Sequence, residues 1–139
     1  MNLLDEATTC AKPRRTGITI AAGYCIFAGL SEIWAGITGN WMGLLSEPLK
    51  PSFRTALVGS AYVAAGISLL SKRRTGALLG VVFVLLEVLG RVHLVRTGRY
   101  PSGGPDFVKS LIGGAIAILV VVYVTAQWRR FDAGPAQKA

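Results

Sequence analysis

The segment ALLGVVFVLLEVLGRVHLVR, residues 77–96, decides the class of fold that we expect. It reaches the roughly 20 predominantly apolar residues that an α-helix needs to cross the hydrocarbon core of a bilayer. Before its terminal Arg96, its only titratable side chains are Glu87, Arg91 and His93. We therefore predict a transmembrane helix that carries two opposite charges at four-residue spacing.

Three further segments share this length and apolar character: residues 17–38, 53–71 and 106–127. Turn residues separate the segments, such as the KRRTG sequence of residues 72–76 and the Gly- and Pro-rich sequence of residues 97–105. Since backbone polar groups in lipid must hydrogen bond internally, each span must be helical. The sequence thus predicts an all-α fold: an integral membrane four-helix bundle with up-down-up-down topology, forming a single membrane domain over residues 1–139.

The composition of the chain agrees with a membrane location. Of the 139 residues, 52% are hydrophobic and 16% are charged, and the mean hydropathy is +0.50. A small soluble domain buries only a limited fraction of its surface, so it would leave much of this apolar surface in water. The net charge of +8 comes from short basic clusters between the apolar segments and not from one basic face. We therefore expect the lipid bilayer of the cell membrane as a partner, and no nucleic acid.

Positive side chains are distributed unequally between the two predicted sides of the membrane. The side with both termini and the turn at residues 72–76 carries nine: Lys12, Arg14, Arg15, Lys72, Arg73, Arg74, Arg129, Arg130 and Lys138. The other side carries five: Lys50, Arg54, Arg96, Arg99 and Lys109. Because cytoplasmic loops carry the excess of Lys and Arg, we expect both termini to be cytoplasmic.

Three charged side chains lie inside the predicted spans: Glu32, Glu87 and Arg91. A charge at mid-membrane costs about 2.5–3.5 kcal/mol on insertion scales, so such residues usually face the interior of a bundle and often mark functional sites. At a rise of about 1.5 Å per residue, Glu32 and Arg91 lie roughly 9 Å from the outer ends of their helices. Glu87 lies one turn deeper and shares a helix face with Arg91, so we expect these two side chains to pair.

Polar side chains of the other helices start at a comparable depth, which predicts one polar pocket in the outer half of the membrane. The candidate ligand-binding residues are Glu32, Ser60, Tyr62, Glu87, Arg91 and Ser110. A structural interpretation stays open, in which Glu87 and Arg91 only neutralise each other and Glu32 is wetted near the headgroups. His93 is rotated roughly 240° from Glu87 and has no partner ligands, so no metal site is expected. No motif identifies catalytic residues or a cofactor, and whether the chain is an enzyme stays open.

Small residues at four-residue spacing predict where the helices touch, because they allow backbones to approach closely. The predicted contact stripes are Ala21, Cys25 and Gly29; Ser60, Ala64 and Ser68; and Ser110 with Gly114. The other cysteine, Cys10, is expected before the first helix on the cytoplasmic side. We therefore expect no disulfide between Cys10 and Cys25.

Two segments resemble the DoxX-like superfamily of small four-helix membrane proteins. The sequence FAGLSE, residues 27–32, is similar to the F-x-G-x-x-K/E pattern that those proteins place late in their first helix. The sequence LVGSAYVAAG, residues 57–66, resembles their G-x-x-E-x-x-x-G segment, with Tyr62 where an acid is common. The resemblance implies a function linked to thiosulfate–quinone oxidoreduction, to redox-stress complexes or to the assembly of other membrane proteins.

Taken with the charged residues, these features predict an accessory or enzyme subunit that binds a small lipophilic molecule, quinone- or lipid-like, near Glu32, Glu87 and Arg91. Two alternatives stay open. A small transporter would need a homodimer to enclose a path, because a bundle of this size has little room for both a packed core and a cavity. A lipid-linked sugar flippase similar to the GtrA family belongs to this class. The other alternative is a structural or assembly partner of a larger membrane-protein complex.

Overall fold

The computed structural model describes residues 3–43, 45, 50–71, 73–128 and 131, with side chains described from Thr16 onward. Its elements are four α-helices: α1 Leu3–Thr38, α2 Phe53–Leu70, α3 Arg74–Arg96 and α4 Gly104–Ala126. By length and composition, α2, α3, α4 and the Thr16–Thr38 part of α1 are each able to cross a membrane. The described part of the chain therefore confirms the predicted all-α class with four apolar helices.

Helix α1 is much longer than predicted, whereas the other helices lie close to their predicted ranges. The prediction of residues 17–38 matches the candidate membrane span Thr16–Thr38, but α1 itself begins at Leu3. Cys10, which we expected before the helix, therefore lies within it. The difference arises because an apolar run marks only the part of a helix that suits lipid and says nothing about where a polar helix before it begins.

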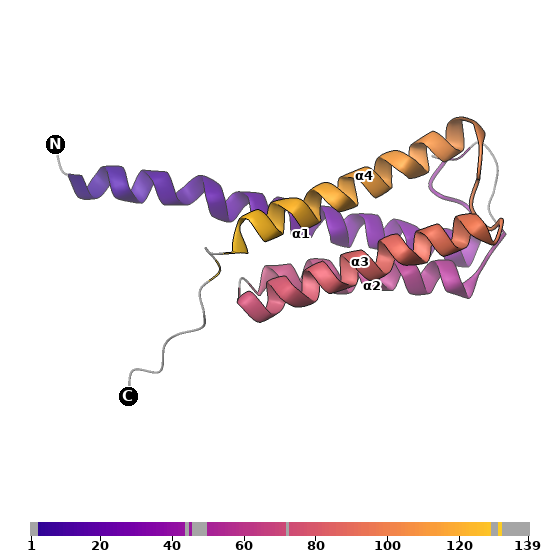
Figure 1. Ribbon diagram of the computed structural model, residues 1–139, viewed down its shortest axis with the longest axis horizontal. Coiled ribbons are helices and arrows are strands. Elements are labelled where there is room, and N and C mark those ends of the chain that lie inside the picture. The colour runs from indigo at the N-terminus through magenta and orange to yellow at the C-terminus, as the bar shows by residue number, and fades with distance from the viewer. Residues whose placement is uncertain (1–2, 44, 46–49, 72, 129–130, 132–139) are drawn as a thin grey trace.

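The helices lie lengthwise along one another, and the N-terminal part of α1 projects beyond the other three (Figure 1). The C-terminal ends of α1 and α3 and the N-terminal ends of α2 and α4 lie together at the right of Figure 1. We call this the loop end. The C-terminal ends of α2 and α4 and the start of α3 lie toward the opposite end, which positions residues late in α1 and α3 at comparable levels.

Helices α1 and α2 are packed so closely that their backbones touch, at what we call the α1–α2 seam. A Cβ atom added to Gly29 would lie 2.6 Å from the carbonyl oxygen of Gly59, and one added to Gly36 would lie 2.5 Å from the amide nitrogen of Ala56. A Cβ atom on Gly66 would likewise lie 2.7 Å from the carbonyl oxygen of Ala22. Only glycine permits this approach, so these positions fix the two helices against each other.

The predicted contact stripes are only partly correct. Ala21, Cys25 and Gly29 are buried as predicted, and Cys25 is a free, buried thiol. Helix α2 instead buries a different face: Thr55, Gly59, Tyr62, Ala65, Gly66 and Leu69. The spacing rule identified three residues on a neighbouring face of α2, because small residues occur on more than one side of this helix.

Helix α4 packs on its neighbours through side chains rather than through its glycines. A Cβ atom on Gly114 would meet nothing within 4 Å, and one on Gly113 would meet only the guanidinium of Arg91, at 3.3 Å from Nη1. Ala117 and Val124 are its buried apolar residues. The predicted stripe of Ser110 and Gly114 is thus correct for buried Ser110 and wrong for Gly114.

Candidate functional site

Arg91 on α3 is the centre of a buried ion cluster near the loop end. Its Nε atom donates to Oε1 of Glu87 at 2.8 Å, and its Nη2 atom lies 2.5 Å from the same oxygen. Nη2 also donates to Oε1 of Glu32, which comes from α1. The predicted pairing of Glu87 with Arg91 is therefore confirmed, and Glu32 extends the pair to a cluster of three.

All three charged side chains of this cluster are buried. Their exposed fractions are 1% for Glu32, 0% for Glu87 and 9% for Arg91. The interpretation in which Glu32 is wetted near the headgroups is therefore wrong for this structure, because Glu32 points to Arg91 inside the bundle. Two carboxylates face one guanidinium, so the fully ionised cluster carries one excess negative charge.

Two aromatic rings from the loop end cover Arg91. The Cζ atom of Arg91 lies 5.9 Å from the ring centroid of Trp41 and 6.0 Å from that of Tyr100. This is the distance at which a cation is attracted by the face of an aromatic ring. The two rings also meet edge to face, with centroids 5.9 Å apart. Burial and then the negative charge of Glu32 raise the pKa of Tyr100, so its hydroxyl stays protonated at neutral pH.

The backbone turns that follow α1 and α3 position the rings of Trp41 and Tyr100. Helix α1 ends at Thr38, and Gly39 follows with a φ of 74°, which glycine adopts readily, and with an amide that donates to the carbonyl of Ala35 at 2.8 Å. The chain then turns, and Trp41 follows. After α3, the amides of Arg99 and Tyr100 both donate to the carbonyl of Leu94, at 3.0 and 3.3 Å. These bonds fold the chain back over the end of α3 and bring Tyr100 to the cluster.

Five buried polar atoms in and beside the cluster have no hydrogen-bond partner among the described residues: Glu32 Oε2, Glu87 Oε2, Arg91 Nη1, Tyr62 Oη and Trp41 Nε1. The carboxylate oxygens are acceptors, Arg91 and Trp41 are donors, and the tyrosine hydroxyl can be either. Leaving a buried donor or acceptor unpaired costs about 1–3 kcal/mol. Tyr62 belongs to this group because it lies within electrostatic reach of Glu87 and packs edge to face on Tyr24, 6.2 Å between centroids. Such a concentration of unpaired groups is typical of a place where a polar molecule binds.

Helix α4 meets Arg91 at a glycine. Nη1 of Arg91, one of the unpaired donors, faces Gly113, as the 3.3 Å approach of an added Cβ shows. Ser110 and Asp106 are buried on the same helix, and Asp106 forms an ion pair with Lys109 at 3.0 Å. The guanidinium of Arg91 therefore packs against α4 at Gly113, where any larger side chain would crowd it.

Most of the predicted site residues come together, and one does not. Glu32, Glu87 and Arg91 form the cluster, buried Tyr62 lies within electrostatic reach of Glu87, and Ser110 lies on the buried face of α4. Ser60 is exposed, and its hydroxyl donates to the carbonyl of Leu57 at 2.7 Å. Ser60 and Tyr62 are two residues apart on a helix, roughly 200° of rotation, so they cannot both face the interior.

Sequence reasoning missed Trp41, Tyr100 and Gly113. Trp41 and Tyr100 could have been found from the position of Arg91, which lies near the C-terminal end of its helix. Aromatic residues in the connections at that end are within reach of its side chain. Gly113 carried no signal of its own, because its role follows only from the side of α4 that faces Arg91.

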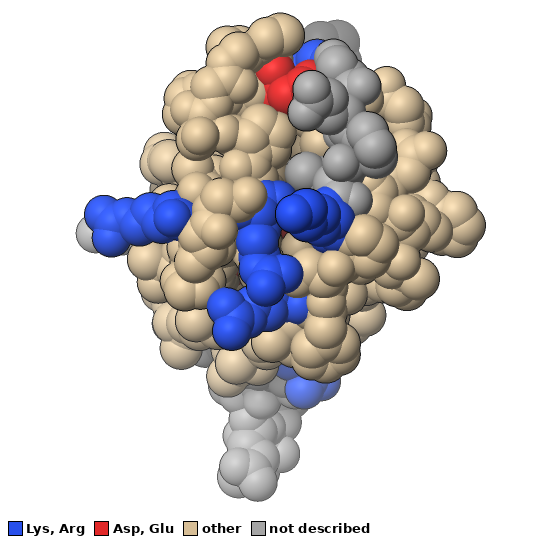
Figure 2. Space-filling view, turned by 90° about the vertical axis from the view of Figure 1, so that its right-hand side faces the viewer, with Lys and Arg blue, Asp and Glu red and all other residues tan. Residues whose placement is uncertain are grey.

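Basic side chains surround the loop end, next to the cluster. Figure 2 shows this end of the molecule, with Lys and Arg side chains gathered across it. The exposed basic residues there are Lys50, Arg54, Arg96, Arg99 and Lys109. The side chain of Arg99 is held in place by a hydrogen bond, in which its Nη1 donates to the hydroxyl of Ser52 at 3.1 Å. The surface above the cluster is thus positive, whereas the buried cluster holds two carboxyl groups and one guanidinium.

The cluster offers both donors and acceptors to a ligand, and its charge selects against some ligands. An anionic group would meet two buried carboxyl groups that already share one guanidinium, and an unpaired charge is costly in a buried place. A neutral polar group that accepts from Arg91 or Trp41 and donates to Glu32 or Glu87 would pair several of the free atoms at once. Comparisons of the chain with protein-family models, with curated proteins and with solved structures find no match.

Proposed function

We propose that the chain is a multi-pass protein of the cell membrane, with up-down-up-down helices and both termini in the cytoplasm. The outward-facing surface of the four helices supports membrane insertion, because it exposes many large apolar side chains. Examples from each helix are Phe27, Ile37, Leu57, Ile67, Leu89, Val92, Leu119 and Val122. An apolar surface of this extent is rare on soluble monomers. The excess of Lys and Arg on the side of the termini supports the orientation, which puts the loop end outside.

Within this membrane protein, we propose that the Arg91 cluster binds the polar end of a small lipophilic molecule, quinone- or lipid-like. The chain would then act as an accessory or enzyme subunit. The observation that carries the proposal is the set of five buried, unpaired polar atoms at the cluster. A neutral head with carbonyl or hydroxyl groups fits both the donors and the acceptors, and the charge of the cluster disfavours an anionic head.

The resemblance to DoxX-like proteins is consistent with this proposal. The segment FAGLSE, on which the resemblance rests, contributes Glu32 to the cluster. The second segment contributes Tyr62, whose hydroxyl is one of the unpaired atoms. Both resemblance segments therefore supply a group to the proposed site.

One observation favours a second function, that of a small dimeric transporter. Glu32 and Glu87 share a single guanidinium, and each keeps one unpaired oxygen. A proton or another cation would neutralise the remaining charge, and intramembrane carboxylates of this kind serve as ion-coupling sites in transporters. A transporter of this size would have to be a homodimer, so a strictly monomeric protein in detergent would exclude it.

Trp41 allows a direct test of ligand binding, because its ring adjoins Arg91. In a Trp34→Phe, Trp128→Phe background, the remaining tryptophan fluorescence reports on this position alone. A benzoquinone carrying a decyl chain should quench this fluorescence in a saturable way. Removing one unpaired group by Tyr62→Phe should weaken binding about tenfold, the factor given by about 1.4 kcal/mol.

Ser60→Ala is the matched control for Tyr62→Phe, since it removes an exposed hydroxyl from the same helix. It should leave the saturation curve unchanged. Quenching that rises linearly with probe concentration, or that responds equally to the two substitutions, would mean that the probe only dissolves in the surrounding detergent. The proposed ligand site would then be rejected.

A further inference from the structure

Arg91 binds the two carboxyl groups of the cluster unequally. Oε1 of Glu87 accepts from two of its nitrogen atoms, from Nε at 2.8 Å and from Nη2 at 2.5 Å. Oε1 of Glu32 accepts from Nη2 alone, and the other partner of Glu32 is the uncharged hydroxyl of Tyr100. A hydrogen bond from a charged donor is roughly twice as strong as one between neutral groups, and such bonds favour the ionised form of a carboxyl group. The contacts therefore favour a negative charge on Glu87 over one on Glu32.

The cluster has one cation for its two carboxyl groups. Among the residues that the structure describes, Arg91 is the one cation within electrostatic reach of Glu32 and Glu87. Lys109 of α4 pairs instead with Asp106, at 3.0 Å. A second negative charge in this buried place would have no cation of its own, and a buried group in that situation takes up a proton. Two carboxyl groups that share one site likewise hold one proton between them.

The titratable groups that α1 and α2 bring near Glu87 are uncharged at neutral pH. They are Tyr24 and Cys25 of α1 and Tyr62 of α2, which all lie within electrostatic reach of Glu87. The usual pKa values of these side chains, about 10 for tyrosine and about 8.5 for cysteine, lie above neutral pH. None of the three therefore supplies the missing positive charge.

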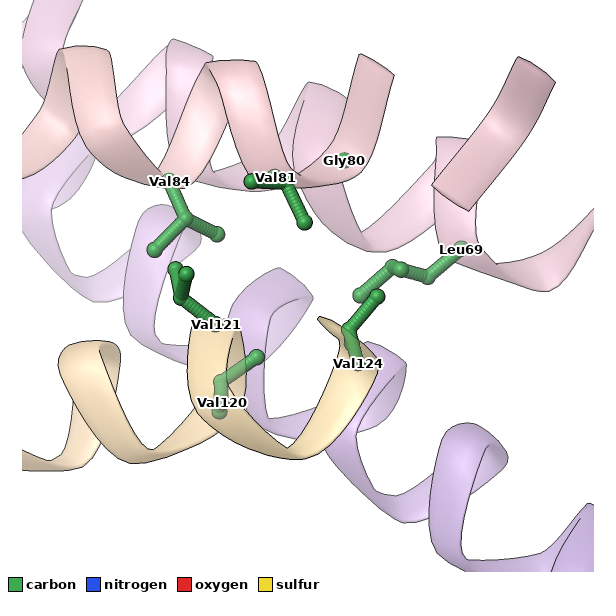
Figure 3. A pocket seen from close by; sticks show the side chains of 7 residues that line it. All are labelled: Leu69, Gly80, Val81, Val84, Val120, Val121 and Val124. Atoms are coloured by element: carbon green, nitrogen blue, oxygen red, sulfur yellow. The ribbon is translucent and has the colours of Figure 1, made fainter. Parts of the chain in front are cut away.

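Helix α4 brings apolar side chains and a glycine to this part of α3. Val84 precedes Glu87 by three residues, and Figure 3 shows it pointing toward Val121 of α4. Closer to the loop end, α4 meets Arg91 at Gly113. Neither contact brings a charged group to Glu87, so the charge of the cluster has to be balanced within the cluster itself.

We propose that Glu32 binds one proton at neutral pH, while Glu87 stays ionised as the counter-ion of Arg91. The cluster is then a proton-binding site without net charge, and the proton gives Glu32 a hydrogen-bond donor. Release of the proton leaves an extra negative charge buried between α1 and α3, so their contact depends on pH. The inference deepens the proposed function, since it names the proton as a ligand of the same cluster. It rests on the proposed membrane location and not on the lipophilic ligand.

Infrared spectroscopy detects such a proton directly, because a protonated carboxylic acid has a C=O stretching band that ionised carboxylates lack. The full-length protein in detergent at neutral pH should show one such band, which shifts in D2O. Glu32→Gln should abolish the band, because Glu87 stays ionised opposite Arg91. Asp106→Asn is the control and should leave the band in place, since Asp106 already has a cation as its partner.

Two matched substitutions show which carboxyl group holds the proton, because glutamine has nearly the shape of a protonated glutamate. Glu32→Gln should be at least as stable as wild type at neutral pH. Glu87→Gln leaves Glu32 as the counter-ion of Arg91, with one charged hydrogen bond in place of two. Its unfolding temperature should therefore lie several degrees below that of Glu32→Gln.

The difference in stability between wild type and Glu32→Gln should also depend on pH. Below the usual glutamate pKa of about 4.3, Glu32 is protonated in the folded and the unfolded protein, so the difference should be constant. Above it, the unfolded chain releases a proton that the folded protein keeps, so wild type should lose stability relative to Glu32→Gln as the pH rises.

Each outcome of these measurements supports or overturns the inference. A wild-type spectrum without the band at neutral pH would show that both carboxyl groups are ionised, or that a metal cation takes the place of the proton. If Glu32→Gln is less stable than Glu87→Gln or does not fold, the proton belongs to Glu87, and equal stability would mean that the two share it. Failure of Glu87→Gln alone to fold would agree with the proposal. The infrared band does not depend on Trp41 quenching, so the ligand site and the proton site are accepted or rejected separately.

Discussion

Glycines occur both at the α1–α2 seam and on α4, but only those of the seam bring two helix backbones into contact. At the α1–α2 seam, each glycine meets backbone of the other helix: Gly29 meets Gly59, and Gly36 meets Ala56. On α4, Gly113 meets only the end of a long side chain and Gly114 meets nothing within 4 Å. A glycine therefore brings two helices together only where its partner is also small at the same level.

This difference divides the bundle into a fixed part and a more adaptable part. The fixed part is α1 with α2, and the adaptable part is the contact of α4 with α3. The Arg91 cluster lies between them, because Arg91 and Glu87 belong to α3 and Glu32 belongs to α1. The following predictions test how strongly each part holds the molecule together.

The largest effect on stability is expected from substitutions in the ion cluster that links α3 to α1. Arg91→Leu leaves the carboxylates of Glu32 and Glu87 buried without a cation, and breaking a buried ion pair in this way costs about 3–5 kcal/mol. We expect a marked fall in the thermal unfolding temperature of the detergent-solubilised protein.

Removing the carboxylates that Arg91→Leu leaves without a cation should restore stability step by step. The Glu87→Leu, Arg91→Leu double variant still buries Glu32, so its recovery should be partial. The triple variant with Glu32→Gln leaves no charge in the cluster and should be the most stable of the three. Equal unfolding temperatures for the single, double and triple variants would show that the carboxylates gain protons or water at no cost, and that the cluster does not hold α1 to α3.

Replacing glycine by alanine should have a smaller effect on stability. We expect the effect to be opposite in sign at Gly36 in the fixed part and at Gly114 in the adaptable part. Gly36→Ala places a Cβ 2.5 Å from the backbone nitrogen of Ala56, so the helices must separate. Overpacking of this kind costs about 1–3 kcal/mol. Gly114→Ala has open space and should stabilise α4 by about 0.5–1 kcal/mol, since glycine weakens a helix interior.

The two alanine variants are each other's control, because the chemical change is identical. Unfolding in detergent, followed by circular dichroism, gives the sign of each effect. The same sign at both positions would mean that α4 is packed as closely as α2 in solution, and the division of the bundle into a fixed and an adaptable part would be wrong.

The helices and the pair of Glu87 with Arg91 were predictable because both depend on local sequence. Apolar runs of membrane length mark the spans, and four-residue spacing places two side chains on one helix face. The longer α1 was not predictable in this way, since apolar runs carry no information about where a polar helix begins. Its start at Leu3 instead of residue 17 also moved Cys10 into the helix.

The rest of the site depends on contacts between distant parts of the chain. Glu32 meets Arg91 only because the α1–α2 seam and the packing of α3 set the rotation of each helix, and a depth argument does not supply that rotation. A depth argument that ignores helix rotation also selects Ser60 together with Tyr62, although these two residues lie on different faces of α2. The positions of Trp41 and Tyr100 depend on turns at Gly39 and Gly98, which both have a positive φ, and the residue types alone do not determine the direction of these turns.

The smallest effect is expected at Tyr100, in the connection between the two loosely packed helices, and it should appear only at high pH. Burial and then the charge of Glu32 raise the pKa of Tyr100 above its usual value of about 10. Below that pH the phenol is neutral in both states, and its contribution to stability is fully present. Above a pH of about 10, Tyr100 ionises in the unfolded chain before it ionises in the folded protein. The free energy of unfolding therefore falls as the pH rises through the pKa of Tyr100 in the folded protein. Tyr100→Phe lacks this titration, and the stability of wild type relative to this variant should therefore fall above a pH of about 10. Parallel curves of unfolding temperature against pH for the two proteins would show that Tyr100 is open to solvent, and that the α3–α4 connection does not close over Arg91.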